Sequence, residues 1–173
     1  PALSSTTMSS EPASAAARLC SACGMCCDGV LFHSVLLQPG DSARALSAAG
    51  LKIKRRSGGV YFHQPCPAHN GCGCTIYDRR PARCRLFNCR QICRVTAGEA
   101  SEEAALKMIR EARGLVASIN ALINRLAETN PNRALAQRCA NALTAPERTP
   151  LHEELAATMQ KLEELLAKEF RIG

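Results

Sequence analysis

The first stretch that could do chemistry is CSACGMCC, residues 20–27, which places four thiols within eight residues. Cys20, Cys23 and Cys26 follow a C-x2-C-x2-C spacing, and Cys27 comes directly after. Short C-x2-C loops let two sulfur atoms reach one ion, and this register matches the first three ligands of a bacterial ferredoxin cluster. Zinc sites more often use two separated C-x2-C pairs. The spacing therefore predicts a metal site and favours an iron–sulfur cluster, with a zinc or iron ion as the alternative.

A second block supplies the thiols that would complete this ligand set, because the fourth ferredoxin ligand is missing from the first run. Its cysteines are Cys66, Cys72, Cys74, Cys84, Cys89 and Cys93. His63 and His69 stand three residues on either side of Cys66 and are additional candidate ligands. Together these residues suffice for two four-coordinate sites, but their spacing does not decide which thiols share an ion. Adjacent thiols do not easily share one ion, so we expect Cys27 either to serve a second site or to stay unused.

Metal ligation is preferred over disulfides because of the expected compartment. The first residues have neither a basic segment nor an apolar run typical of a signal peptide, so we expect a reducing cytoplasm. Eleven cysteines also cannot all pair with one another. Cys139 lies far from the others along the chain, on an apolar helical stripe, and we expect it to be a small buried hydrophobe.

Charge is divided along the chain in the same way as the cysteines. Residues 1–98 carry a net charge of +8, and residues 99–173 carry −1. Because several arginines alternate with the second cysteine block, we expect them to offset the negative charge of metal-bound thiolates. Aromatic residues make up only 3% of the chain, too few for base stacking, and no apolar run could span a membrane. Nucleic-acid binding and membrane insertion are therefore not expected.

The hydrophobic patterns predict an α+β fold in three parts. Residues 1–17 are expected to form a disordered tail, residues 18–98 a metal-organised module, and residues 99–173 a helical extension. Within the module we expect a strand over residues 30–37, a helix over 42–49 capped by Asp41, and a hairpin turning at 57–59. A further short helix is expected within residues 79–95, and it would place Cys89 and Cys93 on one face.

The extension shows the periodicity of amphipathic helices. The first stripe has a 3-4-3-4-3 spacing and consists of Ile109, Ala112, Val116, Ile119, Ile123 and Leu126. Thr96 and Glu99 fit a capping box before it, with Ser101 as a competing cap. A second helix is expected after Asn130-Pro131, with Leu135, Cys139 and Ala142 on one side. The third is expected after Thr149-Pro150, and its apolar positions are Leu155, Met159, Leu162 and Leu166.

The cysteine pattern resembles the YkgJ-like cysteine-cluster family, described as a zinc- or iron-chelating domain with a C-x2-C-x2-C-C signature. Residues 20–27 match that signature, and Cys66-Pro67 with residues 74–89 match a later pattern, C-P and then C-x-I-Y-x-x-R-P-x-x-C-R-x-F-x-C. The resemblance covers residues 18–95 and implies metal chelation by these cysteines. Cys72, Cys93 and His69 have no place in the pattern. A flagellin lysine N-methylase carries a similar cluster, but the resemblance does not transfer methylase activity.

These observations predict a metal-binding protein with no independent catalytic residues. The sequence contains no P-loop, nucleophile elbow or dinucleotide fingerprint. We expect Arg80, Arg85 and Tyr77 to lie around the metal ligands. Two alternatives stay open: an enzyme or redox protein that uses the metal centre, and an adaptor whose C-terminal helices bind a protein partner.

Overall fold

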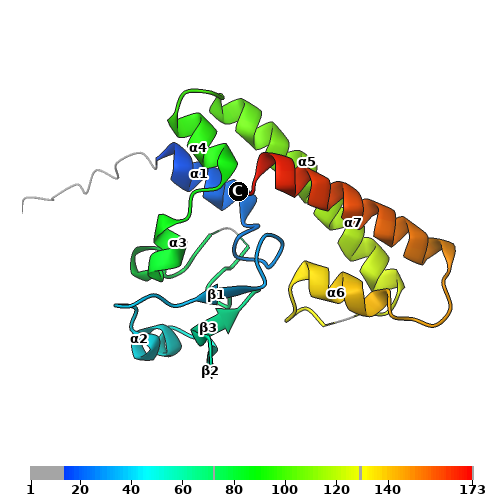
Figure 1. Cartoon of the computed structure of the whole chain (residues 1–173). Coiled ribbons are helices and arrows are strands. Elements are labelled where there is room, and N and C mark those ends of the chain that lie inside the picture. Colours follow the sequence, from blue (N-terminus) through cyan, green and yellow to red (C-terminus); the bar gives the residue numbers. More distant parts are fainter. Residues whose placement is uncertain (1–13, 72, 129, 173) are drawn as a thin grey trace, which may run out of the picture.

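A computed structural model describes residues 14–71, 73–128 and 130–172 (Figure 1). Its helices are α1 (Ala15–Cys23), α2 (Ala43–Ala48), α3 (Ala82–Leu86), α4 (Arg90–Thr96), α5 (Glu102–Arg125), α6 (Leu135–Ala142) and α7 (Pro150–Glu169). A 3-10 turn, η1 (Tyr77–Arg79), precedes α3, and the strands are β1 (Ser34–Leu36), β2 (Ile53–Arg56) and β3 (Gly59–His63). These helices and the small sheet confirm the predicted α+β class. The first turn of α1 falls within the last residues of the predicted tail.

The three strands form an antiparallel sheet in the order β1-β3-β2. Phe62 in the central strand is opposite Val35 on one side and Ile53 on the other, and only 1% of its surface is exposed. The predicted hairpin is confirmed, and Gly59 leaves its turn with a φ of +119°, a region that favours glycine. We call the cluster under this sheet the small core; its buried members are Val35, Leu46, Leu51, Phe62, Ala68 and Ile76.

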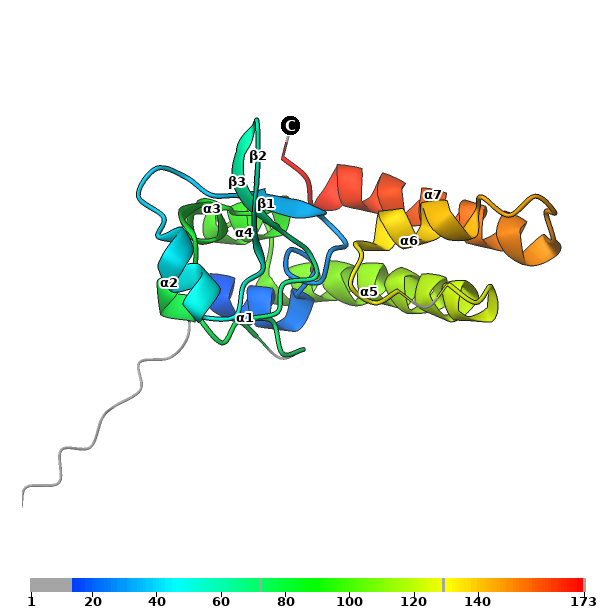
Figure 2. The ribbon, with the colours of Figure 1, turned by 90° about the horizontal axis from the view of Figure 1, so that it is seen from below.

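Helices α5 and α7 run antiparallel, and α6 lies beside them (Figures 1 and 2). The stripe predicted for α5 is confirmed, since Ile109, Ala112, Val116, Ile119 and Ile123 are buried and Leu126 is half-buried. We call the cluster around these helices the large core. It also takes in Leu19 and Met25 from the first cysteine run, so the C-terminal helices form one core with that run. No helix in the described ranges is long and apolar enough to cross a bilayer.

The strand predicted over residues 30–37 is too long. Val30 and Leu31 are buried in the large core instead, and the N–H of Leu31 donates to the carbonyl of Met25 at 2.9 Å. Strand pairing therefore begins only at Ser34. Residues 30–37 are mostly apolar as expected, but Val30 and Leu31 pack in the large core and Val35 packs in the small core. A local sequence pattern does not distinguish the two cores.

Asp41 is not the cap of α2. Ser42 is, because its hydroxyl accepts the N–H of Ala45 at 3.1 Å. The Asp41 carboxylate instead accepts the N–H groups of Gln38 at 2.8 Å and Ala82 at 2.9 Å. It thus fixes the start of α3 against the loop before α2.

The capping box at Thr96 is also wrong. Thr96 is the last residue of α4, and Ser101, the competing cap, accepts the N–H of Ala104 at 3.1 Å to begin α5. The second helix of the extension starts at Leu135, later than the predicted Asn130-Pro131 signal.

The single helix predicted within residues 79–95 is divided into α3 and α4. Phe87 has an extended backbone, with φ −74° and ψ 118°, and Cys89 then caps α4. As a result, Cys89 is buried whereas Cys93 is exposed, so the two thiols do not share one environment.

Candidate metal centre

Eight of the predicted ligands surround one cavity of about 490 Å³, which we call the thiol cavity. They are Cys20, Cys23, Cys26, Cys27, Cys66, Cys74, Cys84 and Cys89. They come from α1 and the turn after it, the loop after β3, helix α3 and the cap of α4. The fold therefore brings the two cysteine blocks together around one space.

The turn after α1 separates the four thiols of the first run. Gly24 ends the helix with a φ of +65°, and its N–H donates to the carbonyl of Cys20 at 2.9 Å. Met25 then enters the large core with no exposed surface, and Cys26 and Cys27 follow it along the cavity wall. A Cβ atom at Gly24 would lie 3.0 Å from the His69 ring, so this position favours glycine for space as well as for φ.

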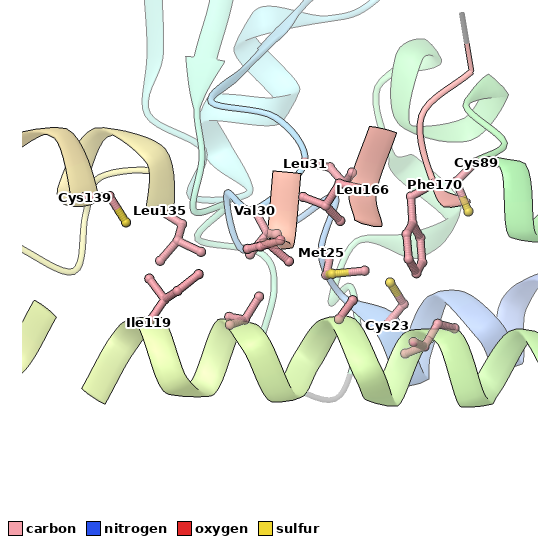
Figure 3. Close-up of a cluster of buried hydrophobic side chains, with 14 of the residues drawn as sticks. Cys23, Met25, Val30, Leu31, Cys89, Ile119, Leu135, Cys139, Leu166 and Phe170 are labelled. Atoms are coloured by element: carbon pink, nitrogen blue, oxygen red, sulfur yellow. The ribbon is translucent and has the colours of Figure 1, made fainter. Parts of the chain in front are cut away.

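Three of the thiols that line the cavity pack against the large core: Cys23, Cys26 and Cys89. Figure 3 shows Cys23, Met25, Phe170 and Cys89 gathered at one end of this core above α5. Burial raises the pKa of Cys23 to about 12, and negative charge on Cys89 and Cys20 contributes to the rise. Burial also raises the pKa of Cys26 strongly, with Cys23 and Cys89 as its main charged neighbours. Cys20 also lines the cavity and is exposed.

Three other lining thiols pack against the small core: Cys66, Cys74 and Cys84. Cys27 belongs with them, because the N–H of Cys66 donates to its carbonyl at 2.7 Å. Burial raises the pKa of Cys27 to about 12, and the charges of Cys66, Cys74 and Cys84 are its next causes. The pKa of Cys84 is raised to about 11 by burial and then by Cys66. A bridge between His69 and Cys74 closes the loop that carries these thiols.

The donor set fits a thiophilic cation. Burial raises the pKa of the Cys23, Cys27, Cys66 and Cys84 thiols, and negative charge on neighbouring thiolates also raises each of these pKa values. A cation among them would reverse this balance, because metal coordination deprotonates a thiol outright. Four-thiolate sets are the usual ligands of both zinc and iron–sulfur clusters. Within the described residues no three thiol, imidazole or carboxylate groups converge on one point, so ligation requires side-chain rotation into the cavity.

Positive charge reaches the cavity through Arg80. Its guanidinium lies 3.6 Å from the centre of the Tyr77 ring, and its Nε donates to the Tyr77 carbonyl at 2.9 Å. Arg80 opposes the rise in pKa that burial and neighbouring thiolates produce at Cys20 and Cys84. Arg80 and Tyr77 both line the cavity, whereas Arg85 is exposed on α3 and does not line it.

The remaining candidate ligands are distributed differently. His69 lines the cavity, whereas His63 stacks edge-on against Tyr61 at 5.2 Å and is not part of the lining. Cys93 is exposed outside the cavity wall, and Cys72 lies outside the described residues. Cys139 is buried in α6 with its sulfur 3.7 Å from that of Met159, in agreement with its expected packing role.

Two residues that hold the first cysteine run in place, Gln64 and Asp28, could not be assigned this role from the sequence. Gln64 is 2% exposed and lines the cavity. Its Nε2 donates to the Cys26 carbonyl at 2.9 Å, and its Oε1 has no hydrogen-bond partner among the described residues. Asp28, directly after the first run, accepts the Arg113 guanidinium of α5. Both contacts join segments far apart in the chain, so only the folded structure could identify them.

Comparison with known families supports metal binding by this chain. Residues 19–113 match the family model CxxCxxCC, whose description reads "Putative zinc- or iron-chelating domain". The match covers more than half of the chain, and the chain belongs to this family. All eight cysteines of the thiol cavity lie within the matched residues. No curated protein and no solved structure matches the chain.

Proposed function

We propose that this protein binds iron or zinc through the cysteine thiolates of the thiol cavity. The observation that carries the proposal is that eight thiols from both cysteine blocks line one space of about 490 Å³. Such a density of soft donors is suited to zinc and to iron–sulfur clusters rather than to hard cations. The described cysteines are free thiols, so all eight in the cavity are available as ligands.

The iron–sulfur form is favoured over single zinc ions. A space for one water molecule needs only about 10–15 Å³, so the cavity has room for inorganic sulfide as well as metal. The C-x2-C-x2-C register of Cys20, Cys23 and Cys26 points the same way. Zinc remains the alternative, since four cysteines also make a structural zinc site.

The residues of this chain would hold and tune the metal. A bound iron–sulfur cluster supplies electron transfer, and a bound zinc ion supplies a structural cross-link. Arg80 would offset part of the negative charge of the thiolates, and Gln64 would hold the Cys26 peptide in place. Leu19, Phe87 and Phe170 line the cavity with apolar surface, which limits access of water to the ligands.

The proposal is tested by anaerobic purification followed by metal analysis, an acid-labile sulfide assay and an absorption spectrum. We expect iron and sulfide in comparable amounts together with charge-transfer absorption in the visible range. Zinc without sulfide in a colourless protein would select the zinc form. A protein that retains neither metal, and takes up neither when it is offered under reducing conditions, would contradict the proposal.

A further inference from the structure

We infer that the thiol cavity holds two separate four-thiolate metal centres, an inference that rests on the proposed function. The first thiol group consists of Cys20, Cys23, Cys26 and Cys89. The second thiol group consists of Cys27, Cys66, Cys74 and Cys84. The adjacent residues Cys26 and Cys27 provide one ligand to each centre, so the peptide bond between them joins the two.

The two hydrophobic cores separate the thiols in this way. Cys23, Cys26 and Cys89 pack against the large core formed with the C-terminal helices. Cys66, Cys74 and Cys84 pack against the small core under the sheet. Side chains anchored in different cores do not move together toward one point, because close-packed interiors resist such displacement. The anchoring therefore favours two centres over one.

The backbone around Cys26 and Cys27 is held from both sides. The Cys26 carbonyl accepts from Nε2 of Gln64 at 2.9 Å, and the Cys27 carbonyl accepts from the N–H of Cys66 at 2.7 Å. These bonds fix the peptides on either side of Cys27, where two adjacent thiols do not easily share one ion. The same arrangement answers what the sequence left open, because it gives Cys27 a place in the second group.

Helix geometry gives Cys20 its place in the first group. Cys20 lies one turn before Cys23 in α1, so the two residues share a helix face, and α1 packs against α4, whose cap is Cys89. Arg80 also lines the cavity, where its positive charge reduces the repulsion between anionic thiolates.

The test compares double variants within and across the groups. Cys23→Ala with Cys89→Ala disables the first group, and Cys66→Ala with Cys84→Ala disables the second. Cys84→Ala with Cys89→Ala removes one ligand from each. With two centres, each within-group variant retains about half of the wild-type metal, because the other four thiols are intact. The cross-group variant loses most of it, and Cys139→Ala, outside the cavity, keeps the full amount.

A single centre shared by all eight thiols predicts another pattern. Every double variant would then lose metal to a similar degree, and a within-group variant that loses all its metal while circular dichroism remains helical would overturn the inference.

A measurement on the unaltered chain covers the case in which the variants do not fold. Anaerobic titration of the metal-free chain with Co²⁺ should saturate the thiolate-to-cobalt absorption at two equivalents. Saturation at one equivalent would also overturn the inference, although metal binding itself would stand. No thiolate-to-cobalt absorption at all would contradict the proposed function instead.

Discussion

The N–H of Cys66 donates to the carbonyl of Cys27 at 2.7 Å, and this bond joins the two cysteine blocks. Cys27 lies in the turn after α1, and Cys66 lies just after β3. The β2–β3 hairpin thus positions the second cysteine block next to the first. The ligand set is assembled by the fold rather than by local spacing, and contacts that hold these two segments should control metal retention.

Gln64→Ala tests one such contact. The substitution leaves the Cys26 carbonyl without its donor in a buried position, and we expect a loss of about 1–3 kcal/mol in the free energy of unfolding. Metal should also dissociate faster, because the Cys26 peptide becomes free to move. Gln160→Ala, on the exposed face of α7, is the matched control and should change stability by less than about 0.5 kcal/mol. Unfolding curves and metal-release rates that are the same for both variants would count against this role of Gln64.

Arg80→Gln tests the electrostatic support of the thiolates. Arg80 lowers the pKa of Cys20 and Cys84, so its loss raises both pKa values and lets protons compete better with the metal. The pH of half-release in an acid titration should therefore move upward, by up to about one unit. The control Arg79→Gln changes an exposed arginine of η1 and should leave the pH of half-release unchanged. An unchanged or lower half-release pH for Arg80→Gln would contradict the assignment.

The metal-free reduced chain should show a fixed order of alkylation. Burial, with negative charge on neighbouring thiols, raises the pKa of Cys23 to about 12, so at pH 8 only about one molecule in 10⁴ carries its reactive thiolate. Cys93 is exposed and should react with iodoacetamide first. Because the raised pKa lies above the assay range, each unit of added pH should speed labelling of Cys23 about tenfold. Peptide mass spectrometry that finds equal labelling of Cys23 and Cys93 at pH 8 would refute this order.

Much of the helical part could be predicted from the sequence. The stripe from Ile109 to Ile123 fixes α5 because helical period and burial coincide there, and Thr149-Pro150 marks the start of α7. The strand predicted over residues 30–37 is longer than the observed β1, because Val30 and Leu31 belong to the large core. Their apolar character is identical in either core, so no local pattern reveals which one they enter.

The candidate site could be predicted as a set of residues but not as an arrangement. The spacing of Cys20, Cys23 and Cys26 predicts metal ligands, whereas the proximity of Cys27 to Cys66 depends on the hairpin. The break at Phe87 separates the environments of Cys89 and Cys93, which a continuous helix would have made alike. Gln64 contacts Cys26 and Arg113 contacts Asp28, and each contact joins segments far apart in the chain. Local sequence does not predict such contacts.

Removal of the metal should affect the two cores differently. We expect hydrogen exchange in the sheet and in the loop after β3 to accelerate strongly when a chelator is added, because few apolar side chains hold that region. Helices α5 and α7 should keep most of their protection, since Leu155, Leu162 and Leu166 are fully buried between them. They also serve as the internal control. Equal exchange with and without metal in both regions would show that metal does not organise the small core.

X-ray absorption at the metal edge of the anaerobically loaded chain tests whether the cavity thiolates are the metal ligands. We expect a first shell of sulfur at about 2.3 Å with four sulfur neighbours for each metal atom. Changing all eight cavity cysteines to alanine should abolish the signal, whereas Cys139→Ala should leave it unchanged. A first shell dominated by nitrogen or oxygen at about 2.0–2.2 Å, or a sulfur shell that survives loss of the cavity cysteines, would contradict metal binding by these thiolates.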